Sequence, residues 1–389
     1  MKKPISICCV GDLILDEPGP VEPYFDDCRE VLNQQDLLIG QVETPHTKRC
    51  LPSCVDLQAP PSDPEHLKAL TGAGFHVGTV AGNHLYDCGP YGVIDTVEKL
   101  KEVGIMPAGG GANITEAKKP VIVEREGYQI GIIDLNATGP KLGRPTSQKP
   151  GCNFIEVMTS YSPMLDMPGS SVKSHTFILP ADMKKFQDEV AELRKEVDIL
   201  VVCMHKGYGG DKPELLEYEQ PLCYAAIDAG ADMVFAHHHH VLKGVEFYKG
   251  RPIYHGLGNF VCVTYAMTAG HNDTPEMIAY LKQRAREGRG DGHYEVDFYP
   301  WSELSRLTMI ARVVVNENGV AECGFIPCHI EKSGKVAVKN RENGGQEIVD
   351  FMVKQTEGIG AEVRFVWSED GTFVSMKERR EDREEVNNS

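Results

Sequence analysis

The chain has 389 residues, of which 41% are hydrophobic and 25% charged, and its formal net charge is −17. This length predicts about one to three domains with a sizeable core, and the composition excludes a fibrous or wholly disordered protein. The negative charge argues against nucleic acid as a partner, because duplex binding needs clustered Lys and Arg. A small or oligomeric anionic substrate stays possible where metal ions or a few placed cations compensate locally. The oligomeric state is not predictable from these properties.

The N-terminal segment reads MKKPISICCVGD, and its apolar run is too short for the core of a signal peptide. No stretch of the sequence approaches the roughly 18 apolar residues that span a bilayer. We therefore expect a cytoplasmic protein with no membrane anchor.

Twelve cysteines are scattered along the chain, several of them inside apolar runs. Reduced, packed thiols are the ordinary outcome in such runs. The pair Cys50 and Cys54 leaves two alternatives open, a metal site and a disulfide, but no second pair follows at zinc-site spacing.

Short apolar runs alternate with helical spacings from residue 5 to residue 260, which predicts an α/β fold with helix-covered sheets. The predicted strands are Ile5–Val10, Leu37–Val42, His76–Val80, Gln129–Leu135, Asp198–Met204, Asp232–Ala236 and Pro252–Phe260. The predicted helices are Pro64–Leu70, Tyr91–Val103, Asp182–Val197 and Glu219–Ala229. A hairpin over Leu307–Asn316 and Val320–Ile326 turns at Asn318-Gly319.

Two segments, 136–180 and 266–303, have few periodic runs and are expected to be loop excursions that shape the site. The second contains a predicted helix at 275–286. We expect one main domain over residues 1–330 and a C-terminal extension over 331–389, whose charged tail from Lys377 is predicted to be disordered.

Five strand ends finish in oxygen or imidazole donors, which are the ligands that divalent metals such as Zn, Mn or Fe prefer. Each donor alone has an ordinary explanation as a packed histidine, a helix cap or a turn residue. Their repetition favours a metal centre of Asp12, Glu43, Asn83, His205 and the run His237–His240. Within that run, alternate residues of an extended chain share a face, so His238 and His240 are expected to reach one centre.

In this order, the motifs resemble those of the CapA (poly-gamma-glutamate capsule synthesis) family, which belongs to the calcineurin-like metallophosphatase superfamily. The resemblance runs from about Ile5 to Phe260. It rests on Gly-Asp12, Glu43-Thr-Pro, Gly-Asn83-His84 with Asp87-x-Gly89, His205-x-Gly207, His-His-x-His240 and Leu-Gly-Asn259-Phe.

The resemblance implies a four-layer α/β/β/α sandwich with two divalent metal ions at the sheet edge. It implies that the metal ligands are Asp12, Glu43, Asn83, His205, His238 and His240, with Glu43 as the bridging carboxylate. It also places His84 near the leaving group as an acid, oriented by Asp87.

The chain departs from the family pattern at several positions. Ile14 stands where the wider superfamily has a metal-binding His, as is usual in the CapA branch, and Gln41 replaces an Asn of the family pattern. Further departures are Lys206 for Trp, Gly209 for Glu, His239 for Pro, and His255-Gly256 for Tyr-Ser. Lys206, His255 and Asn259 are candidates for contacting an anionic substrate group, whereas the ordinary alternative for the first two is a surface Lys and a packed His.

These features predict a metal-dependent hydrolase in which a metal-bound hydroxide attacks a phosphoester or a γ-glutamyl-type amide. His84 is expected to protonate the leaving group. An alternative is a non-catalytic, metal-containing component of poly-gamma-glutamate capsule biosynthesis, which the loss of the His at position 14 favours. A third alternative is an α/β domain whose histidines serve only in packing. It requires hydrogen-bond partners for four consecutive histidines.

Overall fold

The computed structural model describes residues 2–53, 59–264 and 302–378, together with Pro275, Ile278, Ala279 and Lys282. These four residues are helical, and they fall in the helix predicted at 275–286. Met1, residues 54–58, the remainder of 265–301 and the tail from residue 379 lie outside the described residues.

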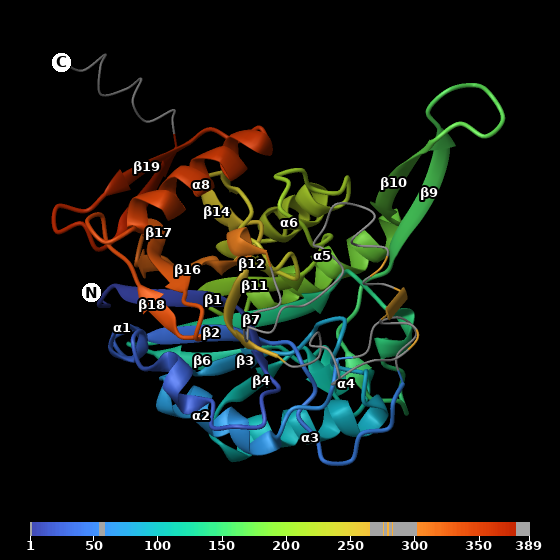
Figure 1. Cartoon of the computed structure of the whole chain (residues 1–389), viewed down its shortest axis with the longest axis horizontal. Helices are drawn as coiled ribbons and strands as arrows, with labels where there is room; N and C mark the ends of the chain where they lie inside the picture. Colours follow the sequence, from blue (N-terminus) through green and yellow to red (C-terminus); the bar gives the residue numbers. More distant parts are fainter. Residues whose placement is uncertain are drawn as a thin grey trace.

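Two large sheets form the centre of the protein (Figure 1). The ten-stranded sheet has the order β19-β20-β17-β16-β1-β2-β3-β4, with β15 paired to β1 and β18 to β17. Its strands are β1 (Ile5–Leu15), β2 (Leu37–Val42), β3 (Val77–Thr79), β4 (Met106–Ala108), β15 (Asn259–Val263), β16 (Leu307–Asn316), β17 (Gly319–Ile330), β18 (Val336–Val338), β19 (Val363–Trp367) and β20 (Val374–Glu378).

The second sheet has six strands in the order β13-β14-β12-β11-β7-β6. They are β6 (Val121–Arg125), β7 (Tyr128–Asn136), β11 (Ile199–His205), β12 (Met233–His237), β13 (Val245–Tyr248) and β14 (Arg251–Tyr254). Two small sheets pair β5 (Gly110–Gly111) with β8 (Gly151–Cys152) and β9 (Val157–Pro163) with β10 (Val172–Ile178).

Most of the helices cover the outer faces of the two large sheets, whereas the last one packs into the inner core through Ile348, Val349 and Met352 (Figure 1). The α-helices are α1 (Arg29–Asn33), α2 (Leu67–Gly72), α3 (Gly89–Glu102), α4 (Ile114–Ala117), α5 (Pro180–Arg194), α6 (Glu219–Asp228) and α8 (Gly345–Gly358). Short 3-10 turns are η1 (Glu22–Phe25), η2 (Pro64–His66), η3 (Lys141–Gly143) and η4 (Glu303–Arg306). Within the described part of the chain, every helix is too short or too polar to cross a bilayer.

Successive residues of a strand point to opposite faces of the sheet. The central strands therefore place alternate residues in an inner core and in an outer core. Ile7 and Cys9 of β1 pack with Ile130 and Val201 of the other sheet, so the two sheets face each other. Cys8 of β1 instead belongs to the cluster that includes α2 and α3. A third cluster joins the outer face of β7 and β11 to α5 and α6. This arrangement confirms the four-layer α/β/β/α fold.

Most predicted elements are present with shifted ends. β1 continues five residues beyond the predicted Val10, and α3 begins at Gly89 instead of Tyr91. The predicted strand Pro252–Phe260 was wrong as one element, because the structure divides it into β14 and β15. Gly258 between them has φ 65°, a left-handed conformation that favours glycine and interrupts a strand.

The chain after residue 330 continues the larger sheet. β18 and β20 both pair with β17, and β19 pairs with β20. The predicted hairpin of β16 and β17 is confirmed, with Asn316 opposite Gly319. Residues 331–378 therefore pack with the main body, while most of the tail expected from Lys377 lies outside the described residues.

The excursion expected at 136–180 contains more secondary structure than its composition predicted. β9 and β10 form a hairpin that extends away from the body (Figure 1) and exposes 68% of Tyr161. The first part of the segment lies closer to the predicted site, since the Asn136 side-chain amide donates to the Gly82 carbonyl at 3.0 Å.

Cys50 and Cys88 form a disulfide, so the Cys50 and Cys54 pairing considered from sequence is wrong. The signal was absent because Cys88 stands 38 residues away and follows Asp87 in a turn before α3. Nine other cysteines among the described residues are free and buried, as the apolar runs predicted.

Removal of this disulfide is expected to destabilise the protein by roughly 2–4 kcal/mol, because the cross-link restricts the unfolded chain over its long loop. Chemical denaturation of Cys50→Ala/Cys88→Ala against the wild type measures the difference. Cys223→Ala, which removes a buried free thiol, is the matched control and separates the cross-link from loss of packing. Equal unfolding midpoints for the wild type and the double variant would contradict the assignment.

Candidate metal centre

The carboxyl ends of parallel strands from both sheets bring the predicted ligands together. Asp12 lies in β1 at a register shift that precedes Ile14, and Glu43 follows the last residue of β2. His205 is the last residue of β11, and His237 ends the neighbouring β12 opposite it. Ligands gather at such strand ends because the loops that follow converge there.

Two groups of ligand atoms meet at this edge, and Glu43 belongs to both. One group is Glu43, His205 and His238, and the other is Asp12, Glu43 and His240. Within each group the ligand atoms all lie within 4.8 Å of one another. A carboxylate shared by two donor groups suits a pair of neighbouring metal ions.

The first group is completed by Asn83. The Nε2 atom of His205 lies 2.7 Å from the Asn83 side-chain oxygen and 3.1 Å from Nδ1 of His238. The same nitrogen lies 4.0 Å from Oε1 of Glu43. These four donors, all predicted as ligands, converge on one small volume.

The second group centres on His240. Its Nε2 atom lies 3.4 Å from Oε1 of Glu43, and its Nδ1 atom lies 3.5 Å from Oδ2 of Asp12. Asn259 places its side-chain oxygen 2.8 Å from Nδ1 of His240, and its predicted contact with a substrate stays a prediction. Ile14 is buried nearby in β1 and offers no ligand atom, so this group has fewer donors than the superfamily pattern.

The two carboxylates are buried without the positive charge that would stabilise them. Asp12 and Glu43 are both 0% exposed, and Oδ1 of Asp12 and both oxygens of Glu43 accept no hydrogen bond from the described residues. Burial raises the pKa of Asp12 to about 8, and burial together with the charge of Asp12 raises the pKa of Glu43 well above its usual value. Buried carboxylates are costly unless paired or bound to a metal. The donor set therefore fits divalent cations.

The histidines of the centre are held in the form that binds metals. Burial, and then the neighbouring histidines, lower the pKa of His205 and of His238 well below the usual value. Neutral imidazole is the ligand form, so these rings need lose no proton when a metal binds at neutral pH.

The predicted extended geometry of the His237–His240 run is wrong. β12 ends at His237, and both His238 (φ 92°) and His240 (φ 56°) are left-handed. This turn sends the two rings to different donor groups, which an extended strand does not do. Positive φ at residues other than glycine costs energy and is typical of functional sites. His237 packs inward, where its Nε2–H donates to the Val10 carbonyl at 2.9 Å.

The predicted acid and its orienting group lie in contact beside the centre. Nδ1 of His84 lies 2.7 Å from Oδ2 of Asp87, which also accepts the Ala59 N–H at 2.8 Å. The His84 side chain is 22% exposed, whereas that of Asp87 is 3% exposed. His84 therefore faces solvent while its partner is held within the protein.

Lys206 and His255 do not lie on the surface. Lys206 is fully buried and donates to Oε2 of Glu219 at 2.7 Å, and its Nζ lies 3.3 Å from Nδ1 of His255. The surface alternative for Lys206 is therefore wrong, and the role of both residues in substrate binding stays a prediction.

Two residues near the centre were missed from sequence. Glu219 resembled an ordinary helix start, and Gln41 was noted only as a replacement for an Asn, with no role at the site. The Gln41 amide is buried with no hydrogen-bond partner among the described residues. A Cβ added to Gly82 would lie 3.1 Å from this amide and 3.7 Å from Nδ1 of His205, which places Gln41 next to the ligands.

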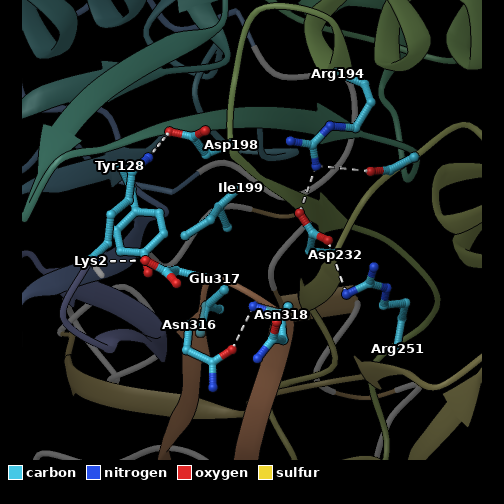
Figure 2. A pocket seen from close by; sticks show the side chains of 13 residues that line it. Lys2, Tyr128, Arg194, Asp198, Ile199, Asp232, Arg251, Asn316, Glu317 and Asn318 are labelled. Atoms are coloured by element: carbon cyan, nitrogen blue, oxygen red, sulfur yellow. Dashed lines mark hydrogen bonds and ion pairs between the residues drawn. The ribbon is translucent and has the colours of Figure 1, made fainter.

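A hollow at the opposite ends of the strands has a different character (Figure 2). Asp198 and Asp232, which precede β11 and β12, face the cations of this hollow. Lys2 pairs with Asp198 at 2.9 Å, and Arg194 and Arg251 pair with Asp232 at 2.7 and 3.1 Å. Because its charges neutralise one another, this hollow is an ion-paired surface feature.

Metal binding is expected to stabilise the fold strongly, because a cation neutralises Asp12 and Glu43. A ligand present at 1,000 times its Kd contributes about 4 kcal/mol when it binds only the folded state. Thermal unfolding of chelator-treated protein with and without Mn²⁺ or Zn²⁺ measures the effect. In Asp12→Asn the rise in Tm should shrink, whereas in the ion-pair variant Asp198→Asn it should equal the wild-type rise. An unchanged wild-type Tm at saturating metal would contradict the site.

The chain is similar to proteins of known families. Residues 6–264 match the family described as "Bacterial capsule synthesis protein PGA_cap". The chain is 27% identical over 269 residues to "PGA biosynthesis protein CapA" of Bacillus subtilis, covering 66% of this chain and 63% of the relative. It is 29% identical over 198 residues to "Capsule biosynthesis protein CapA" of Bacillus anthracis, covering 51% of this chain and 42% of the relative. The matches span less than two thirds of either relative.

Among solved structures, a crystal structure described as a novel phosphatase from Mycoplasma pneumoniae is similar, with 16% identity and a TM-score of 0.45. It covers 90% of this chain and 100% of that chain. The family match includes every predicted ligand, from Asp12 to His240, and extends over most of the chain. The chain therefore belongs to the bacterial capsule synthesis protein PGA_cap family.

Proposed function

We propose that this protein is a metal-dependent hydrolase with a binuclear centre, acting on a phosphoester or a γ-glutamyl-type amide. The observation that carries the proposal is the position of Glu43, whose carboxylate belongs to both donor groups and has no hydrogen-bond partner among the described residues. His205, His238 and Asn83 would hold one ion, and Asp12 and His240 the other. Manganese, zinc and iron all suit these donors.

Two divalent ions held by these residues would lower the pKa of a bound water and neutralise negative charge that develops on the substrate. The protein supplies the remaining steps. His84 protonates the leaving group, and the carboxylate of Asp87 holds the His84 ring and stabilises its charged form. Asn259 fixes the His240 ring through its side-chain oxygen.

The family connection favours a γ-glutamyl bond as the substrate, since the similar Bacillus proteins are described as acting in PGA and capsule biosynthesis. The phosphoester alternative follows from the metal centre itself. The cytoplasmic location expected from sequence is part of the proposal, and cell fractionation tests it.

The test is an assay of metal-reconstituted protein against p-nitrophenyl phosphate, alkyl phosphomonoesters and γ-glutamyl amides. We expect turnover of at least one class that depends on added metal and is lost on chelation. Absence of turnover with Mn²⁺, Zn²⁺ and Fe²⁺, together with absence of metal after purification, would refute the proposal.

A second candidate is a non-catalytic component of poly-gamma-glutamate biosynthesis whose metal centre binds the polymer without cleaving it. Ile14 favours this candidate, because the second donor group lacks the histidine of the superfamily pattern. Metal-dependent binding of poly-γ-glutamate with unchanged polymer length, and strict membrane association of the protein in cells, would support it over the hydrolase.

A further inference from the structure

A second buried polar cluster lies directly behind the metal centre, and it joins the two chain segments that carry the histidine ligands. Oε2 of Glu219, at the start of α6, accepts from Nζ of Lys206 at 2.7 Å and from Nε2 of His239 at 3.0 Å. Lys206 follows the ligand His205 in sequence, and His239 separates the ligands His238 and His240. One carboxylate therefore connects both ligand-bearing segments.

The cluster continues through His255 to a second carboxylate. The Lys206 ammonium lies 3.3 Å from Nδ1 of His255, so this nitrogen accepts and Nε2–H donates to Oε1 of Glu246 at 2.6 Å. The other Glu246 oxygen accepts from the Tyr224 hydroxyl at 2.8 Å. The facing donors and acceptors of this buried network are matched except at Nδ1 of His239, which has no hydrogen-bond partner among the described residues.

Glu219 is held ionised in this setting. Burial alone would raise its pKa, but Lys206 and His239 hold that pKa well below the usual range. Its position at the first residue of α6 also favours negative charge, because the unpaired N–H groups of the first helical turn face it. An ion pair with side chains 0% and 1% exposed is screened little by solvent.

At four residues of this cluster the chain departs from the family pattern. Lys206 stands for Trp, His239 for Pro, His255 for Tyr and Gly256 for Ser. Gly256 is part of the cluster because a Cβ there would lie 2.9 Å from Nδ1 of His239 and 2.8 Å from Cγ of Lys243. Four departures that are scattered in sequence therefore meet in space, and the loss of the serine side chain makes room for the His239 ring.

We infer that Glu219 is a positioning residue, which through Lys206 and His239 fixes His205 and the His238–His240 turn for metal binding. The residues at the four departures then depend on one another. Together they hold the ligands through charged contacts, whereas the family pattern has Trp, Pro and Tyr at these positions. This inference rests on the proposed metal centre. Groups that orient metal ligands from behind typically affect metal affinity by about 10- to 100-fold when replaced.

The test compares Mn²⁺ binding by calorimetry in the wild type, Glu219→Gln and the control Asp232→Asn. Asp232 is a buried carboxylate paired with two arginines at the other end of β12 (Figure 2). We expect Glu219→Gln to bind Mn²⁺ about 10- to 100-fold more weakly. Asp232→Asn should lower Tm but keep the wild-type affinity, because it lies at the far end of the strand.

A second pair of variants keeps the inference testable if Glu219→Gln does not fold. Gly256→Ser pushes on His239 and should weaken Mn²⁺ binding, whereas adding His239→Pro removes the ring that the serine meets. The double variant should therefore bind more tightly than Gly256→Ser alone. Such a gain is a coupling between neighbouring residues that independent sites do not show.

The outcomes separate the two claims. Wild-type protein that binds no Mn²⁺ overturns the proposed function and the inference with it. If the wild type binds Mn²⁺ and Glu219→Gln binds it with the same affinity, the positioning role alone is overturned. Strictly additive effects of Gly256→Ser and His239→Pro on the affinity would overturn it too.

Discussion

Replacing Glu43 with Gln is expected to lower kcat by at least about 100-fold and to reduce the metal content below that of the wild type. The amide that replaces the carboxylate carries no charge, so it stabilises two neighbouring cations far less than the shared carboxylate of Glu43. Loss of one electrostatic group at a reaction centre commonly costs about 10²–10³ in kcat. Elemental analysis gives the metal content, and steady-state kinetics on the active substrate class gives kcat.

Glu65→Gln is the matched control for this variant, because Glu65 is an exposed glutamate paired with Lys68 and Lys99 at the surface. It should keep the wild-type metal content and kcat. A Glu43→Gln protein with wild-type metal content and kcat would show that the carboxylate does not bridge the two donor groups.

Replacing His84 with Asn is expected to affect substrates according to their leaving groups. General acid catalysis contributes about 10²–10⁴-fold when the leaving group is a poor one. For an alkyl phosphomonoester or an amide, kcat should fall by roughly this factor. For p-nitrophenyl phosphate, whose leaving group needs no proton, the fall should be less than about tenfold.

Two observations control for indirect effects of the His84 change. The metal content of His84→Asn should equal that of the wild type, since His84 belongs to neither donor group. Asp87→Asn should show the same dependence on leaving group with a smaller loss, because it removes only the partner that orients the ring. Equal losses on both kinds of substrate would contradict the role of His84 as an acid.

Sequence periodicity predicted the central fold because its strands are buried on both faces or alternate between two cores. β2 has the predicted bounds, and β1, β3, β7, β11 and β12 lie at the predicted apolar runs. The hairpin of β9 and β10 was not predicted, because its residues are half-exposed and mixed in polarity. The strands after residue 330 were missed for the same reason, since β19 is largely half-buried.

The convergence of the predicted ligands could be expected because each lies at or near the carboxyl end of a strand, and parallel strands place these ends together. The division of His238 and His240 between two donor groups was not predictable, since it depends on two left-handed residues that no local pattern required. The pairing of Cys50 with Cys88 and the contact of Glu219 with His239 join segments distant in sequence. Such contacts depend on how the elements pack in three dimensions, and the periodicity of a single sequence gives no sign of them.

The most direct test of the binuclear centre is a titration of metal-free protein with Mn²⁺ in which bound metal and hydrolysis are measured in the same samples. With Glu43 shared between two donor groups, we predict that activity rises to a plateau as two equivalents bind and stays low when only one is bound. Full activity at one equivalent, or activity that is independent of bound metal, would contradict the account.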